Sequence, residues 1–124
     1  MLSEKWNKLI TSYKIVVYIS EKDFEQYLVQ ILEQEVNQIG NYKNCLSWIH
    51  CDSSWTPIQN ASPYIGTINQ IAREKEVRLE FKCDSKDVQK NVEFLKKIHP
   101  YEEPEIDIIP LLSATRLGEL ENFE

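Results

Sequence analysis

Apolar positions alternate with a period of two in the first strongly patterned segment of the chain. The run Tyr-Lys-Ile-Val-Val-Tyr-Ile-Ser at 13–20 is rich in β-branched and aromatic side chains, which predicts a strand. Its two faces carry Ile15, Val17 and Ile19 on one side and Val16 and Tyr18 on the other. Because both faces are apolar, we expect both to be covered.

Two later segments have the period of an amphipathic helix. The first begins at Ser20, whose spacing from Asp23 is typical of a capping box, and we expect it to end at Gly40. The second begins at Asp84 or the serine after it and ends at His99, because the following proline disfavours helical backbone there. The apolar stripes are Phe24, Tyr27, Leu28, Ile31, Leu32 and Val36 in the first helix and Val88, Val92, Leu95 and Ile98 in the second.

Three further strands are predicted at 44–52, 67–83 and 105–112. The middle one is clearest where Val77, Leu79, Phe81 and Cys83 alternate with charged residues, so one of its faces is wet. Pro110 indicates that the end of the last strand lies at a sheet edge or a bulge. The stretch 53–66 contains two prolines and a glycine, which predicts a long excursion rather than a tight hairpin.

The order of these elements is β, α, β, β, α, β. It matches the α+β ferredoxin-like sandwich, in which two helices cover one face of a four-stranded antiparallel sheet. This domain spans 13–112, between an arm or short helix at 1–12 and an acidic tail at 113–124. The other sheet face is left open, and its first strand is apolar on that side. We therefore expect that face to meet a copy of itself in a cyclic homo-oligomer.

Composition and charge narrow the class of protein. The chain has 124 residues, the size of one domain, with a formal net charge of −6 and a pI near 5.0. No stretch concentrates lysine and arginine, so we expect no nucleic-acid partner. The longest apolar run, Ile15–Ile19, is far too short to span a bilayer, and residues 1–8 lack a signal-peptide core. We expect no membrane partner, a cytoplasmic location and three reduced cysteines.

The segment 99–111 carries a resemblance to known families. It reads His-Pro-Tyr-Glu-Glu-Pro-Glu-Ile-Asp-Ile-Ile-Pro-Leu and resembles the hallmark of the CutA divalent-cation-tolerance proteins, where His-Pro-Tyr-Glu-x-Pro-Glu enters the last strand. A closer match is the YqfO-type insert of Nif-three-like dinuclear-metal proteins, which also occurs as free-standing small proteins. Matching that second group are Ile-Gly-Asn-Tyr at 39–42, Cys45, Trp48 and Pro-Tyr-Ile-Gly at 63–66. The resemblance covers nearly the whole chain.

The resemblance implies a ferredoxin-like subunit similar to CutA and the PII signal proteins, which assemble as trimers through their sheets. It implies much less about activity. The dinuclear metal ligands of Nif-three-like proteins lie in the halves that flank the insert, so that metal centre is not carried over. An accessory role beside a Nif-three-like protein rests on this analogy alone.

The thiols and imidazoles do not form a metal motif along the sequence. Cys45 and Cys51 share a predicted strand face but lie roughly 20 Å apart at the rise of a strand. No Cys-x-x-Cys or His-x-x-x-His pair is present. A copper or zinc site would have to be assembled across elements or subunits, from His99 and a thiol such as Cys45 or Cys83. Buried structural cysteines are the more common outcome.

The proline-flanked segment after the second helix has two interpretations. Adjacent carboxylates diverge in an extended chain, so Glu102 and Glu103 are not expected to share a proton. In the structural interpretation, His99 and Tyr101 make buried hydrogen bonds near the helix end. In the functional one, the segment forms a ligand or metal site at a subunit junction. The aromatic residues that could line a pocket, or equally a core or interface, are Tyr42, Trp48, Trp55 and Tyr64.

The inventory for catalysis is incomplete. With two histidines, no Gly-x-Ser-x-Gly elbow and no glycine-rich phosphate loop, we expect no enzymatic activity and no required cofactor. The first hypothesis is a PII/CutA-like oligomeric regulatory module that binds a small ligand between subunits or a protein partner through its long loop. The alternative is a divalent-metal-binding protein of CutA type. The ligand-binding or interface candidates are His99, Tyr101, Glu102, Glu103, Tyr42, Trp48, Tyr64 and Gly66.

Overall fold

A computed structural model describes residues 4–113 of the chain. The predictions for the first three residues and for 114–124 lie outside the described residues. No helix within the described part is both long and apolar enough to cross a bilayer. The elements, in chain order, are α1 (Glu4–Leu9), β1 (Ser12–Ser20), α2 (Glu21–Gln34), β2 (Gln38–Ile39), β3 (Tyr42–Lys43), β4 (Leu46–Trp55), β5 (Ala72–Asp84), a 3₁₀ turn η1 (Ser85–Asp87), α3 (Val88–Ile98) and β6 (Ile106–Leu111).

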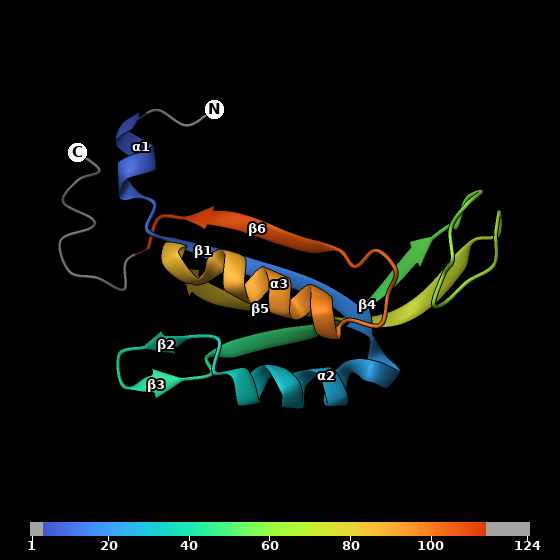
Figure 1. The fold of residues 1–124 in the computed structure, drawn as a ribbon, viewed down its shortest axis with the longest axis horizontal. Helices are drawn as coiled ribbons and strands as arrows, with labels where there is room; N and C mark the ends of the chain where they lie inside the picture. The colour runs from blue at the N-terminus through green and yellow to red at the C-terminus, as the bar shows by residue number, and fades with distance from the viewer. Residues whose placement is uncertain (1–3, 114–124) are drawn as a thin grey trace.

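Four strands form one antiparallel sheet in the order β4-β5-β1-β6. Helices α2 and α3 lie on the same face of this sheet (Figure 1). The predicted ferredoxin-like fold is therefore confirmed. Strand β6 is an outer strand of the sheet, as Pro110 indicated. Proline has no backbone N–H to donate, so within a sheet it is tolerated at an edge.

The core lies between the sheet and the two helices. Alternate residues of β1 and β5 point into it, and their pairing is continuous from Ser12↔Asp84 to Ser20↔Glu76. This alternation confirms the predicted apolar faces of both strands. The buried core comprises Ile15, Val17, Ile19, Val77, Leu79, Phe81 and Cys83 from the sheet, Phe24, Tyr27, Leu28 and Ile31 from α2, Leu95 from α3, and Val36.

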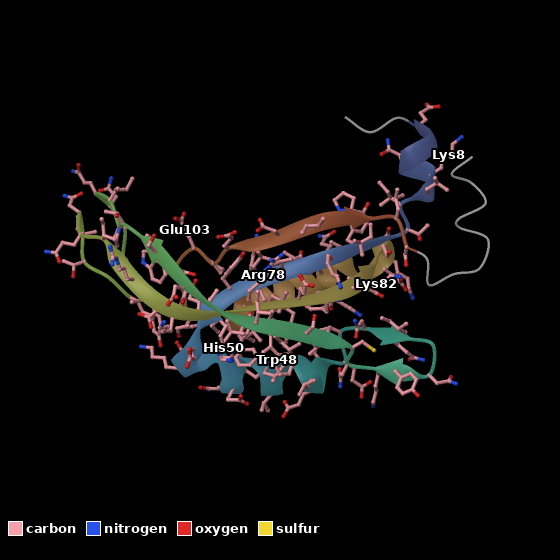
Figure 2. The ribbon with its side chains drawn as sticks, turned by 180° about the vertical axis from the view of Figure 1, so that it is seen from behind. Lys8, Trp48, His50, Arg78, Lys82 and Glu103 are labelled. Carbon is pink, nitrogen blue, oxygen red and sulfur yellow. The ribbon has the colours of Figure 1, made fainter. Side chains whose placement is uncertain are left out.

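The open face of the sheet differs from the prediction along its two central strands. Figure 2 views the molecule from behind, with Arg78 and Lys82 among the labelled side chains. Lys14 Nζ lies 3.8 Å from Glu80 Oε1, and Arg78 Nη2 lies 3.5 Å from Glu80 Oε2. Val16, on the same face, is 1% exposed within a single subunit. The long charged side chains around a central strand can cover it with their apolar stems, so it needs no second copy.

Apolar exposure on this face occurs instead on the two outer strands. Ile49 of β4 is 58% exposed and Ile109 of β6 is 42% exposed. Their partners in the sheet are charged: Ile49 pairs with Arg78, and Ile109 with Lys14. The exposed apolar surface of the open face therefore lies at its edges and not on the first strand, from which the sequence argument started.

Helix α2 begins directly after Ser20, as predicted, although its start is stabilised differently. The Ser20 hydroxyl donates to Asp23 Oδ2 at 2.6 Å and makes no side-chain bond to a backbone N–H of the helix. The buried stripe of the helix is confirmed, except that Leu32 is exposed and Val36 is buried beyond the helix end.

The end of α2 was predicted wrongly. Glu35, not Gly40, takes the left-handed conformation that closes the helix, with φ 53°. Gly40, with φ 58°, instead lies between β2 and β3, which form a two-stranded sheet of their own. The helix is shortened because Asn37 binds elsewhere: its Nδ2 donates to the carbonyls of Cys45 and Lys82, and its Oδ1 accepts the N–H of Cys45.

Strands β4 and β5 continue past the end of β1 as a two-stranded arm, seen at one end of the molecule in Figure 1. Their pairing runs to Trp55↔Ala72, whereas β1 pairs with β5 only as far as Glu76. The predicted excursion at 53–66 and the strand start at Thr67 were therefore both misplaced, since the loop occupies 56–71. Asn69 takes φ 63° there and donates its N–H to the carbonyl of Pro57 at 2.6 Å.

Candidate ligand pocket at the base of the arm

A groove of about 680 Å³ lies where the arm joins the sheet. Its walls come from the outer half of β4, the loop that follows it, one residue of β1, one of β5, and the segment 101–105. The proline-flanked segment that carries the family resemblance therefore forms one wall. A volume of this size is typical of a small-molecule site.

His99 holds this wall in place. Its Nδ1 accepts the backbone N–H of Tyr101 at 3.1 Å, so the ring proton lies on Nε2 and is donated to the carbonyl of Tyr18, 2.7 Å away. The ring is 8% exposed and packs edge-on against Tyr27. Burial lowers the pKa of His99, which favours the neutral ring that these two bonds require.

Tyr101 connects His99 to the groove through two hydrogen bonds. Its hydroxyl donates to Glu76 Oε2 at 2.6 Å, and Glu76 is 3% exposed. Burial, followed by the hydrogen bond that Tyr101 donates to Glu76, raises the pKa of Tyr101 well above its ordinary value. The phenol therefore keeps its proton near neutral pH and acts as a fixed donor.

Aromatic rings surround Tyr101 on the groove side. Its ring centroid lies 5.9 Å from that of Trp55 and 6.0 Å from that of Tyr64. The indole N–H of Trp55 donates to the carbonyl of Ile65 at 3.0 Å, and the Tyr64 hydroxyl donates to Asp23 Oδ1 at 3.3 Å. Side chains of the loop are thus tied to both the arm and the start of α2.

Gly66 lets the loop pass close to the arm. It has φ +118°, and a Cβ at this position would lie 3.1 Å from Pro57 Cγ and 3.5 Å from the Trp55 indole nitrogen. A residue other than glycine would be strained there. Gly66 therefore has a backbone role in the loop.

Carboxylates are spread around the groove. Glu102 Oε1 accepts the backbone N–H of Ser62 at 2.9 Å, which connects the motif segment to the loop. Partial burial and the nearby Asp107 raise the pKa of Glu105. Five carboxylate residues line the groove, and none of the described lining residues is Lys, Arg or His. They are Asp52, Glu76, Glu102, Glu103 and Glu105.

The structure brings together most of the residues that the sequence nominated. His99, Tyr101, Glu102, Glu103 and Tyr64 line or support the groove, with Gly66 in its loop. Two candidates lie elsewhere. Trp48 is on the helix-covered face, where its ring packs 5.3 Å from Phe24, and Tyr42 is 76% exposed on β3.

Sequence reasoning missed Glu76 and Tyr18 as groove residues. Glu76 lies on a strand where charged residues alternate with apolar ones, so nothing distinguishes it from its solvated neighbours. Only the register of the sheet shows that its side chain meets Tyr101, 25 residues away. Tyr18 was recognised as a strand residue, but its place beside the groove depends on the motif segment folding back over β1.

The three metal-ligand candidates do not converge in a subunit. His99 binds beside Tyr18, whereas Cys83 pairs with Tyr13 at the other end of β1, roughly 17 Å away at the rise of a strand. Cys83 accepts a bond from Asn91 at 3.2 Å, and burial raises its pKa. Cys45 donates to the carbonyl of Tyr42. Across residues 4–113, no group of three or more His, Cys, Asp and Glu side chains is placed to hold a metal ion.

The chain resembles known proteins in both sequence and structure. The family model described as CutA1 divalent ion tolerance protein matches residues 58–116. A GTP cyclohydrolase 1 type 2 homolog from Staphylococcus aureus strain Mu50 is 29% identical over 106 residues, which is 86% of this chain. The chain spans only 29% of the length of that relative.

Solved structures that resemble this chain include a NIF3-related protein and CutA proteins. A Bacillus cereus protein related to NIF3 matches with a TM-score of 0.70 and 24% identity, over 84% of this chain and 26% of that one. CutA from Synechococcus elongatus PCC7942 matches with a TM-score of 0.63 and 20% identity, over 86% and 82%. The resemblance predicted from the motif segment is thus confirmed: the chain is similar in sequence to CutA1 proteins and to GTP cyclohydrolase 1 type 2 homologs, and it has the CutA-like ferredoxin fold.

Proposed function

We propose that this chain is a non-enzymatic ligand-binding module of CutA type, which works as a homo-oligomer and uses the groove at the base of the arm as its ligand site. The observation that carries the proposal is the hydrogen-bonded wall made by His99, Tyr101 and Glu76. These groups are fixed by one another before any ligand arrives, which reduces the entropy cost of binding. Tyr101 keeps its proton and His99 has both ring nitrogens engaged, so neither is free to act as a general base.

The arm supplies a reason for assembly. Two isoleucines in its loop, Ile58 and Ile71, are each 70% exposed. Within residues 4–113, strands β4 and β6 also have unpaired outer edges. Exposed apolar groups at the end of an extended arm favour contact with another copy of the chain, and a trimer is the state we propose.

Native mass spectrometry of the full chain tests the assembly. We expect a trimer for the unmodified protein and a shift to monomer when Ile58→Glu and Ile71→Glu are combined, because each charge would be placed in a contact. The matched control is Gln59→Glu, which adds a charge at an exposed polar position of the same loop and should leave the trimer intact. A monomer for the unmodified protein would remove this part of the proposal.

A second candidate function is divalent-metal binding, which the CutA1 family match favours. The ligands would come from more than one subunit, because His99 and Cys83 lie at opposite ends of β1. Copper or zinc titration by calorimetry distinguishes the two candidates. Tight binding that is lost in His99→Gln would support the metal, whereas weak binding that is unchanged in this variant would remove His99 as a ligand.

A further inference from the structure

The charges around the groove are unbalanced. Asp52 is neutralised by Lys75, whose Nζ lies 2.5 Å from Oδ1, and the nearby Arg78 is engaged by Glu80. Among residues 4–113, the carboxylates of Glu76 and Glu105, which also line the groove, form no ion pair with a cationic side chain. An anionic ligand would be repelled by this wall, and a cationic one would be attracted.

Aromatic rings line the same groove. Trp55, Tyr64 and Tyr101 all line the groove. The ring centroid of Tyr101 lies about 6 Å from that of Trp55 and from that of Tyr64. Lys22 Nζ lies 5.1 Å from the centroid of the Tyr64 ring, so one cation–π contact already forms at one of these rings. Aromatic rings placed beside carboxylates are a known means of binding ammonium and guanidinium groups.

The spread of the carboxylates decides which kind of cation fits. A divalent metal ion needs several oxygens converging on one point, and the described residues offer no such group of three. An organic cation has its charge distributed over a larger apolar surface. It can contact both the carboxylates and the rings within a groove of about 680 Å³.

We propose that the groove binds a small organic cation, carrying an alkylammonium or guanidinium group, against the rings of Trp55, Tyr64 and Tyr101 and beside the carboxylates of Glu76 and Glu105. The inference rests on the proposed ligand-binding function and gives that ligand its chemical class. Glu76, which lines the groove and is 3% exposed, is the charged partner. Tyr101 fixes its position through the 2.6 Å hydrogen bond and presents a ring face beside it.

Isothermal titration calorimetry on the full chain tests the cation directly. The probes are choline and agmatine, with 3,3-dimethylbutan-1-ol as the neutral isostere of choline and ADP as an anionic probe. We expect at least one cation to bind, and the neutral isostere to bind at least tenfold more weakly than choline. Equal binding of choline and its isostere, or no binding of either cation, overturns the proposal.

Two carboxylate variants locate the site. Glu76→Gln and Glu105→Gln each remove one charge, and we expect each to weaken cation binding several-fold, with Trp55→Leu weakening it further. The matched control is Glu33→Gln, an exposed carboxylate of α2. Circular dichroism confirms folding of each variant. If Glu76→Gln does not fold, the exposed Glu105 still provides the test, and unchanged affinity in Glu105→Gln counts against the proposal.

The same titrations distinguish failure of the cation proposal from failure of the proposed ligand-binding function. Binding of ADP that is lost in Trp55→Leu, with no binding of either cation, would retain a ligand site in this groove and remove the cation. A chain that binds none of the probes and remains monomeric would remove both. The oligomeric state is measured separately, so failure of the cation proposal can be told apart from failure of the proposed function.

Discussion

At the scale of single residues, His99 organises the site. The sequence alone left two interpretations of His99 and Tyr101, buried hydrogen bonds or a ligand site, and the structure shows the hydrogen bonds at the edge of a groove. The imidazole fixes the backbone of Tyr101, and the Tyr101 side chain then reaches Glu76 in the groove. A structural residue and a groove residue are therefore consecutive members of one hydrogen-bonded chain.

His99 makes the stability of the fold sensitive to acid. Its folded-state pKa is lowered by burial, so the unfolded chain binds a proton more readily. The stabilisation is complete above the ordinary pKa of 6.5 and is lost as pH falls from there through the folded-state pKa. Urea denaturation between pH 8 and 5 should show a falling free energy of unfolding.

The other histidine provides the control for that measurement. His50 is exposed and lies 3.5 Å from Glu21. We expect His50→Gln to keep the acid dependence and His99→Gln to flatten it, while costing about 1–3 kcal/mol at pH 8 through the lost acceptor for Tyr101. Parallel pH curves for His99→Gln and the unmodified chain would contradict this assignment.

The hydrogen bond between Tyr101 and Glu76 can be measured by a double-mutant cycle. Tyr101→Phe leaves a buried carboxylate oxygen without its donor, and we expect it to destabilise the fold by about 1–3 kcal/mol. Combined with Glu76→Gln, the two changes should be non-additive by about 0.5 kcal/mol or more, as expected for contacting residues. Additive effects in chemical denaturation would show that the contact contributes no coupling.

At the scale of elements, the largest departures from the sequence-based prediction are at element ends. The helix α2 was expected to reach Gly40 because glycine is the usual residue for a left-handed helix end. The chain instead uses Glu35, since the Asn37 side chain binds the backbone of two other segments and directs the chain away. Local preference was overridden by a tertiary contact.

This helix end can therefore be improved. Glu35→Gly should stabilise the fold by up to about 1 kcal/mol, because glycine adopts φ 53° without the strain of a side chain. It also removes the exposed Glu35–Lys43 ion pair, a small loss. In thermal unfolding, the control Gln34→Gly, within the helix, should be destabilising. A lower melting temperature for Glu35→Gly would contradict the argument.

At the scale of the whole molecule, the three thiols report on different parts of the fold. Cys83 is 1% exposed in the core, and burial raises its pKa, whereas Cys45 and Cys51 are half-buried. The thiolate is the reactive form, so the Cys83 thiol should react only when the core opens.

Labelling with Ellman's reagent tests this difference. We expect the native chain to show two faster-reacting thiols and one slow thiol, with the slow rate rising with denaturant. Cys83→Ala should remove the slow phase and leave the other two. Reaction of all three thiols at one rate would show that Cys83 is not protected by the core.

The sequence by itself determined the order and type of the principal elements, the stripes of the core and the position of the motif segment. These features depend on local periodicity and on proline, whose effects act within a few residues. Only the tertiary structure decided that β4 and β5 continue as an arm and that Glu76 meets Tyr101. It also decided that Val16 is buried on the open face within a single subunit. These three features depend on strand register and on contacts between segments distant in sequence. None of them is encoded in a local pattern.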